Sequence, residues 1–357
     1  MLKSIVNKLA YALLVMWGVA SLVFCLFSIL PGDPSRMMLG QRDNEEMRLA
    51  IQKKYGFDKP VSSQYLYFMN DLSPLSLHGN SPEDFTNLSN HPYSVISSLK
   101  IASYTLVLKT PYLRESFVRK GVSVSSIIGN TLPNTFVLAI TAMCIALFLG
   151  ISLGLLSAVH QHKFIDQFLS SIAVFGMALP SFFSAILIAW IFGFVYQKYT
   201  GLSMTGSLYE VDDYGRGETL VLKNLILPAI TLGIRPLAVV MQLTRNSILD
   251  TLGEDYIRTA KAKGLTSFRI LFVHALPNAL NPVVTSASGW LASMLAGAVF
   301  VEFIFGWNGL GKEIVYALNY LDLPVVMGAV LTLSICFVII TIFTDLLYYL
   351  LDPKIRG

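Results

Sequence analysis

The sequence is poor in charged residues. Asp, Glu, Lys and Arg make up 13% of its 357 residues, while 54% of the residues are hydrophobic. Soluble domains carry about 25% charged residues, so this composition excludes an ordinary soluble domain and indicates a membrane protein. The net charge of +4 is small and gives no reason to expect a nucleic-acid partner.

Cysteine and histidine are also scarce. The three cysteines, Cys25, Cys144 and Cys336, all lie in apolar stretches, so neither a disulfide framework nor a metal-ligand spacing is predicted. His160 and His162 are the closest pair among the five histidines, and their spacing places them on different sides of a helix. We therefore expect no metal site and no cofactor in this chain.

Catalytic and nucleotide-binding motifs are missing as well. Residues 306–312 match GxxxxGK, most of a phosphate-binding loop, but Glu313 stands where a Ser or Thr should bind magnesium. The match also follows an apolar stretch of membrane length instead of a strand. No Ser-His-Asp or paired-carboxylate arrangement is recognisable, so the chain is predicted not to be an enzyme.

Long apolar stretches dominate what is present, and they predict an all-α polytopic membrane protein with six transmembrane helices. The first stretch is too long for a signal peptide and lacks a small-residue cleavage site, so we expect it to be retained. Gly150 and Gly154 form a GxxxG pattern that permits close helix packing, and Pro180 should kink the third helix. The six stretches are residues 9–30, 135–159, 168–196, 224–243, 282–301 and 324–344.

The basic residues predict the orientation, because short cytoplasmic segments carry an excess of Lys and Arg. With the N-terminus inside, ten fall in short cytoplasmic segments: Lys3, Lys8, Lys163, Arg245, Arg258, Lys261, Lys263, Arg269, Lys354 and Arg356. Four fall in the short outer loops: Lys198, Arg216, Lys223 and Lys312. Both termini are therefore predicted to be cytoplasmic.

The same assignment divides the chain into four regions. Residues 1–30 contain the first helix, 31–134 form a long extracytoplasmic segment, 135–351 form a five-helix core, and 352–357 form a cytoplasmic tail. In the second region, Asp43 can cap a helix that Gly56 ends, and Pro60 can start another. An amphipathic helix is expected from Val124 toward Thr135, and the glycine-rich residues 197–223 are expected to be a loop.

Residues 250–277 form a charged segment between the fourth and fifth apolar stretches. Tyr256 to Lys263 are mostly good helix formers, and Gly264 can adopt the left-handed conformation that ends a helix. Thr266 suits the N-cap of a second helix. The small side chain of Ala260 would let the surface of a partner approach closely.

The spacing in this segment resembles the cytoplasmic EAA loop of permease subunits of ATP-binding cassette importers. Arg258-Thr259-Ala260 occupies the Glu-Ala-Ala triplet, Gly264 follows in register, and Leu276-Pro277 ends the motif. Arg258 replaces the usual Glu, and His274 takes an apolar position. The form RTAKAKGL is similar to the dipeptide, oligopeptide and nickel branch of these permeases.

Three other windows resemble the same branch: residues 56–65, residues 301–311 with Asp322 and Pro324, and residues 351–356. Residues 78–110 match nothing in this branch and are interpreted as an insertion. The resemblance therefore covers nearly the whole chain apart from this insertion.

The resemblance implies a type I importer permease fold in the inner (cytoplasmic) membrane of a bacterium, surrounded by membrane lipid. It implies a second homologous permease as a pseudo-symmetric partner, two ATPase subunits that carry ATP and Mg, and an extracytoplasmic substrate-binding protein. ATPase closure would then drive alternating access. The first helix of the charged segment would dock in the ATPase through Asp255, Tyr256, Arg258, Thr259, Ala260, Lys261, Lys263 and Gly264.

Candidates for the translocation pathway come from the fourth and fifth stretches. Arg235 could contact a substrate carboxylate, although a structural pair with Glu302 or Asp345, or snorkelling to the interface, is the favoured interpretation. Gly289, Ser293 and Gly297 lie on one helix face that could line the pathway, with a helix contact favoured. Glu302 follows at the outer end and is also a candidate.

Two other functional classes remain open in the sequence. A secondary transporter should show an internal repeat or broken helices with intramembrane acids, and neither is recognisable. The second open class is a membrane sensor or scaffold with a large outer segment. The substrate is also open, since peptides, nickel chelates, glutathione and some sugars are all carried in this branch.

Overall fold

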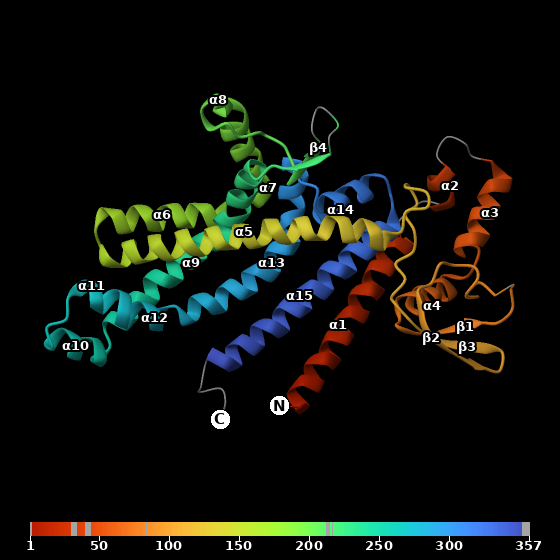
Figure 1. Ribbon diagram of the computed structural model, residues 1–357, viewed down its shortest axis with the longest axis horizontal. Helices are drawn as coiled ribbons and strands as arrows, with labels where there is room; N and C mark the ends of the chain where they lie inside the picture. The colour runs from red at the N-terminus through yellow and green to blue at the C-terminus, as the bar shows by residue number, and fades with distance from the viewer. Residues whose placement is uncertain are drawn as a thin grey trace. The chain divides into compact units, whose positions relative to one another are not determined.

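The computed structural model describes residues 2–29, 34–39, 44–82, 84–211, 215 and 217–351. These residues form two compact units, each described here by itself (Figure 1). Unit 1 comprises Met1–Asn130 and Glu313–Ile335, and unit 2 comprises Thr131–Lys312 and Cys336–Gly357. The predicted tail at 352–357 lies outside the described residues.

Among the described residues, five helices are long and apolar enough to cross a membrane. They coincide with five of the six apolar stretches, which confirms a polytopic helical membrane protein. The predicted amphipathic helix after Val124 and the second stretch form one helix, with Pro133 inside it. The five helices are α1 (Leu2–Ile29), α5 (Val124–Val159), α9 (Lys223–Leu252), α13 (Asn281–Phe305) and α15 (Leu323–Leu351).

The third apolar stretch is broken at Pro180. It forms α6 (Phe164–Ala178) and α7 (Ser181–Ile188), and α7 continues into the π-helix η1 (Ala189–Val195). The two halves are bent by 109°, because Pro180 has no N–H to continue the helical ladder and its ring clashes with the preceding turn. The predicted kink is therefore a full break, and the chain has six spans only if this bent pair counts as one.

Unit 2 packs α5 closely against α9. A Cβ built at Gly150 would lie 2.7 Å from Val240 Cγ1, and one at Gly154 would lie 2.6 Å from the Met241 carbonyl oxygen. From the other side, a Cβ at Gly233 would lie 2.9 Å from the Ala142 carbonyl oxygen. These distances leave no room for side chains, so the GxxxG pattern does mark a close helix contact.

The part of unit 1 that follows α1 begins with three short helices, α2 (Pro34–Leu39), α3 (Glu45–Tyr55) and α4 (Val61–Leu72). Asn44 caps α3 by accepting a hydrogen bond from the Glu46 N–H, and Gly56 ends it with φ of 73°. The two predicted helices are therefore confirmed, with Asn44 as the observed cap. Asp43, the predicted cap, lies outside the described residues.

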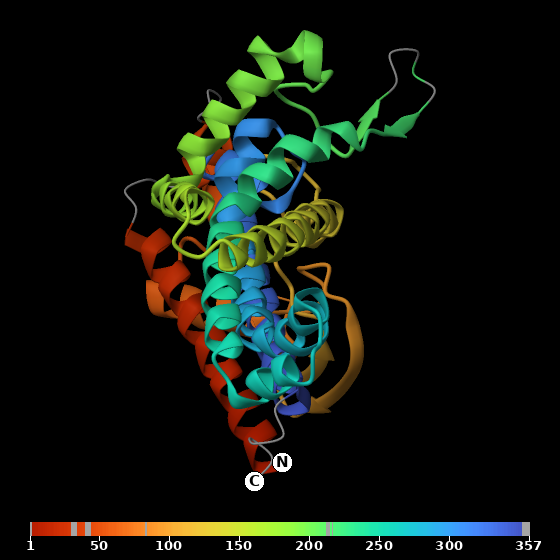
Figure 2. The same ribbon diagram turned by 90° about the vertical axis from the view of Figure 1, so that its left-hand side faces the viewer.

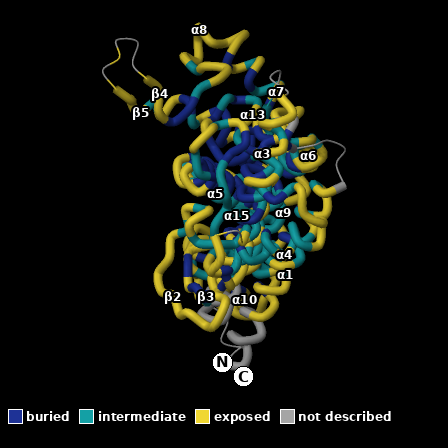
Figure 3. Tube along the Cα trace, turned by 90° about the vertical axis from the view of Figure 1, so that its right-hand side faces the viewer, coloured by how far each residue is buried: buried dark blue, intermediate teal, exposed yellow. Residues whose placement is uncertain are grey.

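The expectation of an all-α chain is corrected by two small sheets. Residues 78–110 contribute most of an antiparallel sheet of order β1–β3–β2, formed by β1 (Leu75–Gly79), β2 (Val95–Ile101) and β3 (Tyr104–Lys109). The predicted loop 197–223 holds the helix α8 (Gln197–Thr200) and a hairpin of β4 (Tyr209–Val211) and β5 (Glu218–Leu220). Figure 3 shows this hairpin exposed. Alternating β-branched and leucine residues favour strands at the first of these sites.

A buried carboxylate fastens the segment between α14 (Leu310–Asn319) and α15 in unit 1. Asp322 lies in the turn after α14 and accepts hydrogen bonds from the Ser116 hydroxyl and, at 3.0 Å, from the Phe117 N–H. Arg119 pairs with Glu313 of α14 at 2.7 Å. The window that includes Asp322 therefore holds residues distant in sequence together.

The glycine contact between α5 and α9 gives the first prediction. Gly154→Ala should lower the thermal stability of the purified protein, because its methyl group collides with backbone atoms and overpacking typically costs about 1–3 kcal/mol. Gly129→Ala is the matched control, since it lies in the same helix and a Cβ there meets no atom within 4 Å. Equal melting temperatures for the two variants would contradict the close contact.

Candidate functional site

The charged segment folds as helix, turn and helix. It forms α10 (Asp255–Ala262), a turn at Gly264, and α11 (Ser267–Arg269), followed by the π-helix η2 (Ile270–Ala275) and α12 (Leu276–Ala279). Gly264 has φ of 76°, and the Thr266 hydroxyl accepts a hydrogen bond from the Arg269 N–H. The predicted left-handed turn and N-cap are both confirmed.

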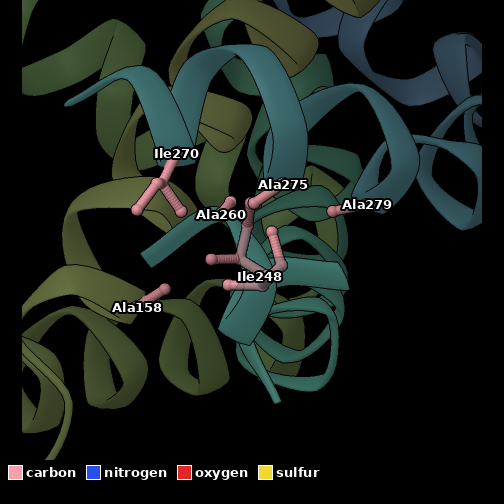
Figure 4. Packing of buried hydrophobic residues seen from close by; sticks show 7 residues of the cluster. Ala158, Ile248, Ala260, Ile270, Ala275 and Ala279 are labelled. Atoms are coloured by element: carbon pink, nitrogen blue, oxygen red, sulfur yellow. The ribbon is translucent and has the colours of Figure 1, made fainter. Parts of the chain in front are cut away.

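One side of this segment packs against the ends of α5 and α9 in unit 2. Ile257 and Ala260 of α10 are buried in an apolar cluster. Figure 4 shows the cluster in close view, and Figure 2 shows the segment folded back along α9. Its other members are Ala158 of α5, Ile248 of α9, and Ile270, Ala275 and Ala279 from the η2 and α12 side.

The opposite side of α10 is exposed. Seven of the eight residues expected to meet an ATPase lie on it: Asp255, Tyr256, Arg258, Thr259, Lys261, Lys263 and Gly264. Ala260 is the exception, because it is 8% exposed and lies in the apolar cluster. The expectation for Ala260 is therefore corrected: its small side chain lets α10 approach the chain's own helices.

Two aromatic residues add to the exposed side of the segment. Phe268 is 71% exposed, and its ring centroid lies 4.5 Å from that of Phe272. Large apolar side chains on the surface of a charged segment indicate a contact site. Sequence reasoning placed both residues on the second helix but did not identify them as contacts; an aromatic pair at i, i+4 beside a basic helix is the pattern that could have found them.

A buried ion pair fixes the ends of the helices from which this segment extends. Arg245 of α9 donates two hydrogen bonds to Asp166 of α6, at 2.6 and 2.7 Å. Asp166 also accepts from the Ser157 hydroxyl at 2.6 Å and from the His162 N–H at 3.0 Å. One carboxylate therefore joins α5, the turn after it, α6 and α9. The sequence analysis missed this role, although Asp166 stands as a lone acid at the start of an apolar stretch.

The glycine-rich residues 306–312 wrap around a carboxylate of the chain itself. Glu302 is fully buried in α13, and its Oε2 accepts hydrogen bonds from the backbone N–H groups of Gly311, at 2.7 Å, and Lys312, at 3.2 Å. A Cβ at Gly309 would lie 2.4 Å from this carboxylate. The N-terminus of α14 thus holds an internal anion where a phosphate-binding loop would hold a phosphate.

Other contacts complete this turn in unit 2. Trp307 is fully buried, and its indole N–H donates to the Asn134 carbonyl at 3.0 Å. The Leu310 N–H donates to the Thr135 hydroxyl at 2.8 Å. Residues 301–311 therefore form a packed structural turn, and Glu302, named as a pathway candidate, lies inside it.

The remaining pathway candidates lie on the surface of unit 2. Gly289, Ser293 and Gly297 of α13 are all exposed, and a Cβ built at either glycine meets no atom within 4 Å. Arg235 of α9 is also exposed. Among the described side chains, none pairs with Arg235, and the side chain of Asp345, one expected partner, is outside the described set.

Comparison with known protein families identifies the chain. Residues 150–357 match the model of the binding-protein-dependent transport system inner membrane component. Residues 1–78 match the model of the N-terminal part of such membrane components. The chain belongs to this family. It is a permease subunit of an ATP-binding cassette importer and not an enzyme.

Relatives match the permease along its whole length. It is 32% identical to the dipeptide transport system permease protein DppB of Escherichia coli K12, over 100% of this chain and 99% of the relative. It is 31% identical to the di/tripeptide transport system permease protein DppB of Pseudomonas aeruginosa UCBPP-PA14, with the same coverage. A putative peptide permease of Brucella suis biovar 1 is 30% identical, again over 100% and 99%.

A solved structure supports the fold of the permease. A chain of the MetNI methionine ABC transporter, in an inward-facing conformation, superposes with a TM-score of 0.50 and 18% identity. The match covers 64% of this permease and 97% of that chain. The likeness is one of fold alone, and it supports a type I importer permease architecture.

The buried ion pair gives the second prediction. Arg245→Ala should strongly reduce the folded yield and thermal stability of the permease, because removing one partner of a buried pair costs about 3–5 kcal/mol. The exposed pair Arg258–Asp255, with 74% and 94% side-chain exposure, is the matched control, and exposed pairs contribute under about 1 kcal/mol. A stability loss for Asp255→Ala as large as that for Arg245→Ala would contradict the anchoring role.

Proposed function

We propose that this permease imports short peptides in the inner membrane of a bacterium. The observation that carries the proposal is the full-length similarity to permeases named for dipeptide and di/tripeptide transport. The cytoplasmic sequence pattern RTAKAKGL, which resembles the same branch, supports it independently. A secondary transporter and a sensor are disfavoured by the family to which the chain belongs.

The partners in this proposal are those of a binding-protein-dependent importer. A second, homologous permease would complete the translocation pathway, two ATPase subunits would bind ATP and Mg, and a substrate-binding protein would deliver the peptide from outside. The family description, with its dependence on a binding protein, supports this set. The exposed face of α13 at Gly289, Ser293 and Gly297 offers a surface of small residues toward the second permease or the pathway.

The orientation in this proposal has six spans and both termini in the cytoplasm. The excess of basic residues in the short segments between spans supports it. In this orientation α10 and α11 face the ATPases, and the segment between α1 and α5 lies outside. The bent pair α6–α7 would count as one span, because its halves together have the apolar length of a membrane helix.

The coupling site in this proposal is the exposed side of α10 with the aromatic pair on the following turn. The basic residues Arg258, Lys261 and Lys263 would meet the ATPase surface, and Phe268 and Phe272 would enter an apolar pocket on it. On its inner side the segment packs on α5 and α9 through the apolar cluster. Movement of an ATPase would therefore displace the segment together with the ends of α5 and α9 on which it packs.

Coupling gives the third prediction, which also tests the proposed function. Gly264→Val should abolish dipeptide uptake and peptide-stimulated ATP hydrolysis while leaving membrane insertion intact. A β-branched residue at positive φ is strained by about 1–3 kcal/mol, and a Cβ there meets no atom within 4 Å, so the strain alone redirects the turn. Uptake is measured with labelled dipeptide in proteoliposomes that contain the co-purified subunits.

Gly264→Asn is the matched control, because asparagine tolerates the left-handed conformation. It should retain most of the uptake. Full peptide-stimulated hydrolysis in Gly264→Val would show that this turn does not couple ATPase and permease. Uptake of another substrate class, with no uptake of dipeptides by the wild type, would overturn the peptide assignment and leave the coupling result standing.

Arg235 gives the fourth prediction. Because it is exposed and no described acid pairs with it, we propose that it faces the pathway and attracts the C-terminal carboxylate of the peptide. Arg235→Ala should assemble in normal amounts and lose uptake of free-carboxylate dipeptides more than uptake of amidated ones. Arg235→Lys should keep part of the preference. A lower folded yield of Arg235→Ala, with no change in substrate preference, would support the structural role instead.

A further inference from the structure

The three-stranded sheet of unit 1 has its apolar side turned outward. In the strand register, Leu77 of β1 and Leu99 of β2 both lie opposite Leu106 of β3, and residues opposite one another share a face of the sheet. This face carries six large side chains that are 43–62% exposed: Leu75, Leu77, Leu99, Ile101, Tyr104 and Leu108. Figure 3 shows β2 exposed along its length.

On the opposite face, the residues of β1 and β3 are buried and mostly polar, whereas Ser98 and Lys100 of β2 are exposed. Ser76, His78, Thr105 and Lys109 are each less than 5% exposed. The Lys109 ammonium donates to the Asp71 carbonyl at 3.1 Å and lies 4.2 Å from the centre of the Tyr93 ring. Burial lowers the pKa of Lys109 to about 8, so this inward lysine is accommodated at a cost.

These polar contacts fix which face points outward. A slip of one residue would bury the leucines and expose Lys109, which is the arrangement expected for a sheet in water. The chain adopts the reverse arrangement and gives the inward groups polar partners, including a 2.9 Å contact between His78 Nε2 and the Ser76 hydroxyl. Six exposed apolar side chains on one face indicate that this face has an apolar environment.

The position of the sheet along α1 shows what that environment is. The helix α4 packs on α1 through a 2.7 Å hydrogen bond between the hydroxyls of Ser21 and Tyr65, and the rings of Phe24 and Phe68 stack at 5.6 Å. Both α1 residues lie inside the membrane-length segment Ala10–Ser28. Ser21 is about 10 Å along the helix from Ser28, at 1.5 Å per residue.

The sheet continues directly from this contact. Asn70, near the end of α4, bonds both the N–H and the carbonyl of Leu77 in β1 at 2.9 Å. Met69 and Leu72 of α4 pack in the same cluster as Val19 and Ala20 of α1. The sheet is therefore held beside the last third of the membrane-length segment of α1, where the apolar residues Leu22 and Leu26 of α1 are exposed.

We propose that the apolar face of the β1–β3–β2 sheet lies in the interfacial layer of the bilayer leaflet at the Ser28 end of α1, in contact with lipid acyl chains. The face carries no charge, which suits lipid and not a charged protein surface. The outer edge of β2 pairs with no described strand, and open sheet edges do not occur in the hydrocarbon core. The sheet must therefore lie at the boundary of headgroups and acyl chains, as interfacial helices do.

A lipid-quenching experiment tests this proposal, which does not depend on the substrate. Cys25, Cys144 and Cys336 are replaced by Ser, and single cysteines are placed at Leu99, Ile101, Ser98 and Lys100 and labelled with NBD. The permease, with its co-purifying subunits, is placed in phosphatidylcholine nanodiscs that contain lipid with a doxyl group high on the acyl chain. Only monodisperse preparations are compared.

We expect quenching at Leu99 and Ile101 several-fold stronger than at Ser98 and Lys100, because neighbouring residues of a strand point to opposite faces. Strong quenching of the Leu99 label by aqueous iodide would show an open, water-exposed face and overturn the proposal. Protection of that label from both quenchers would overturn it too, because another protein surface would then cover the face.

Discussion

The Asp166–Arg245 ion pair is the contact on which the segment from α10 to α12 and the helix ends beneath it depend. Its carboxylate receives four hydrogen bonds, from α9, from the end of α5 and from the turn before α6. In a bilayer such a group is costly unless fully partnered, so the helices can meet only in the arrangement that satisfies it. The segment from α10 to α12 then packs on the helix ends that this pair has aligned.

A buried carboxylate that accepts hydrogen bonds from the chain itself also occurs elsewhere, once in each unit. Glu302 accepts two backbone N–H groups, those of Gly311 and Lys312, and Asp322 accepts the Phe117 N–H and the Ser116 hydroxyl. Both carboxylates belong to the window that resembles the peptide branch. At Glu302 the acceptor sits at a helix N-terminus, where the aligned peptide dipoles favour an anion. A glycine-rich turn that looks like a phosphate site in sequence is therefore explained by an anion the chain supplies itself.

Sequence reasoning succeeded where one residue decides the local backbone. Gly264 and Gly56 end helices at positive φ, Thr266 caps one, and Gly154 allows helix contact, as their chemistry predicts. Sequence reasoning failed where contacts between residues distant in the sequence decide the structure. The sheet at 75–109 depends on register between strands, and the burial of Ala260 depends on how α10 packs.

The same distinction between local and long-range determinants applies to the candidate site. The exposed α10 residues were expected from the resemblance of the segment to the EAA loop, whereas the partner of Asp166 lies on another helix and could not be inferred from spacing. The sheet of unit 1 is the clearest example. The alternation of residues along its strands predicts that the two faces differ, but not which face is buried. That choice rests on Asp71, Tyr93 and Asn70, which accommodate Lys109 and hold Leu77. A membrane-length helix lies beside this sheet, and the sheet's apolar face points outward, which is the reverse of the arrangement expected for a sheet in water.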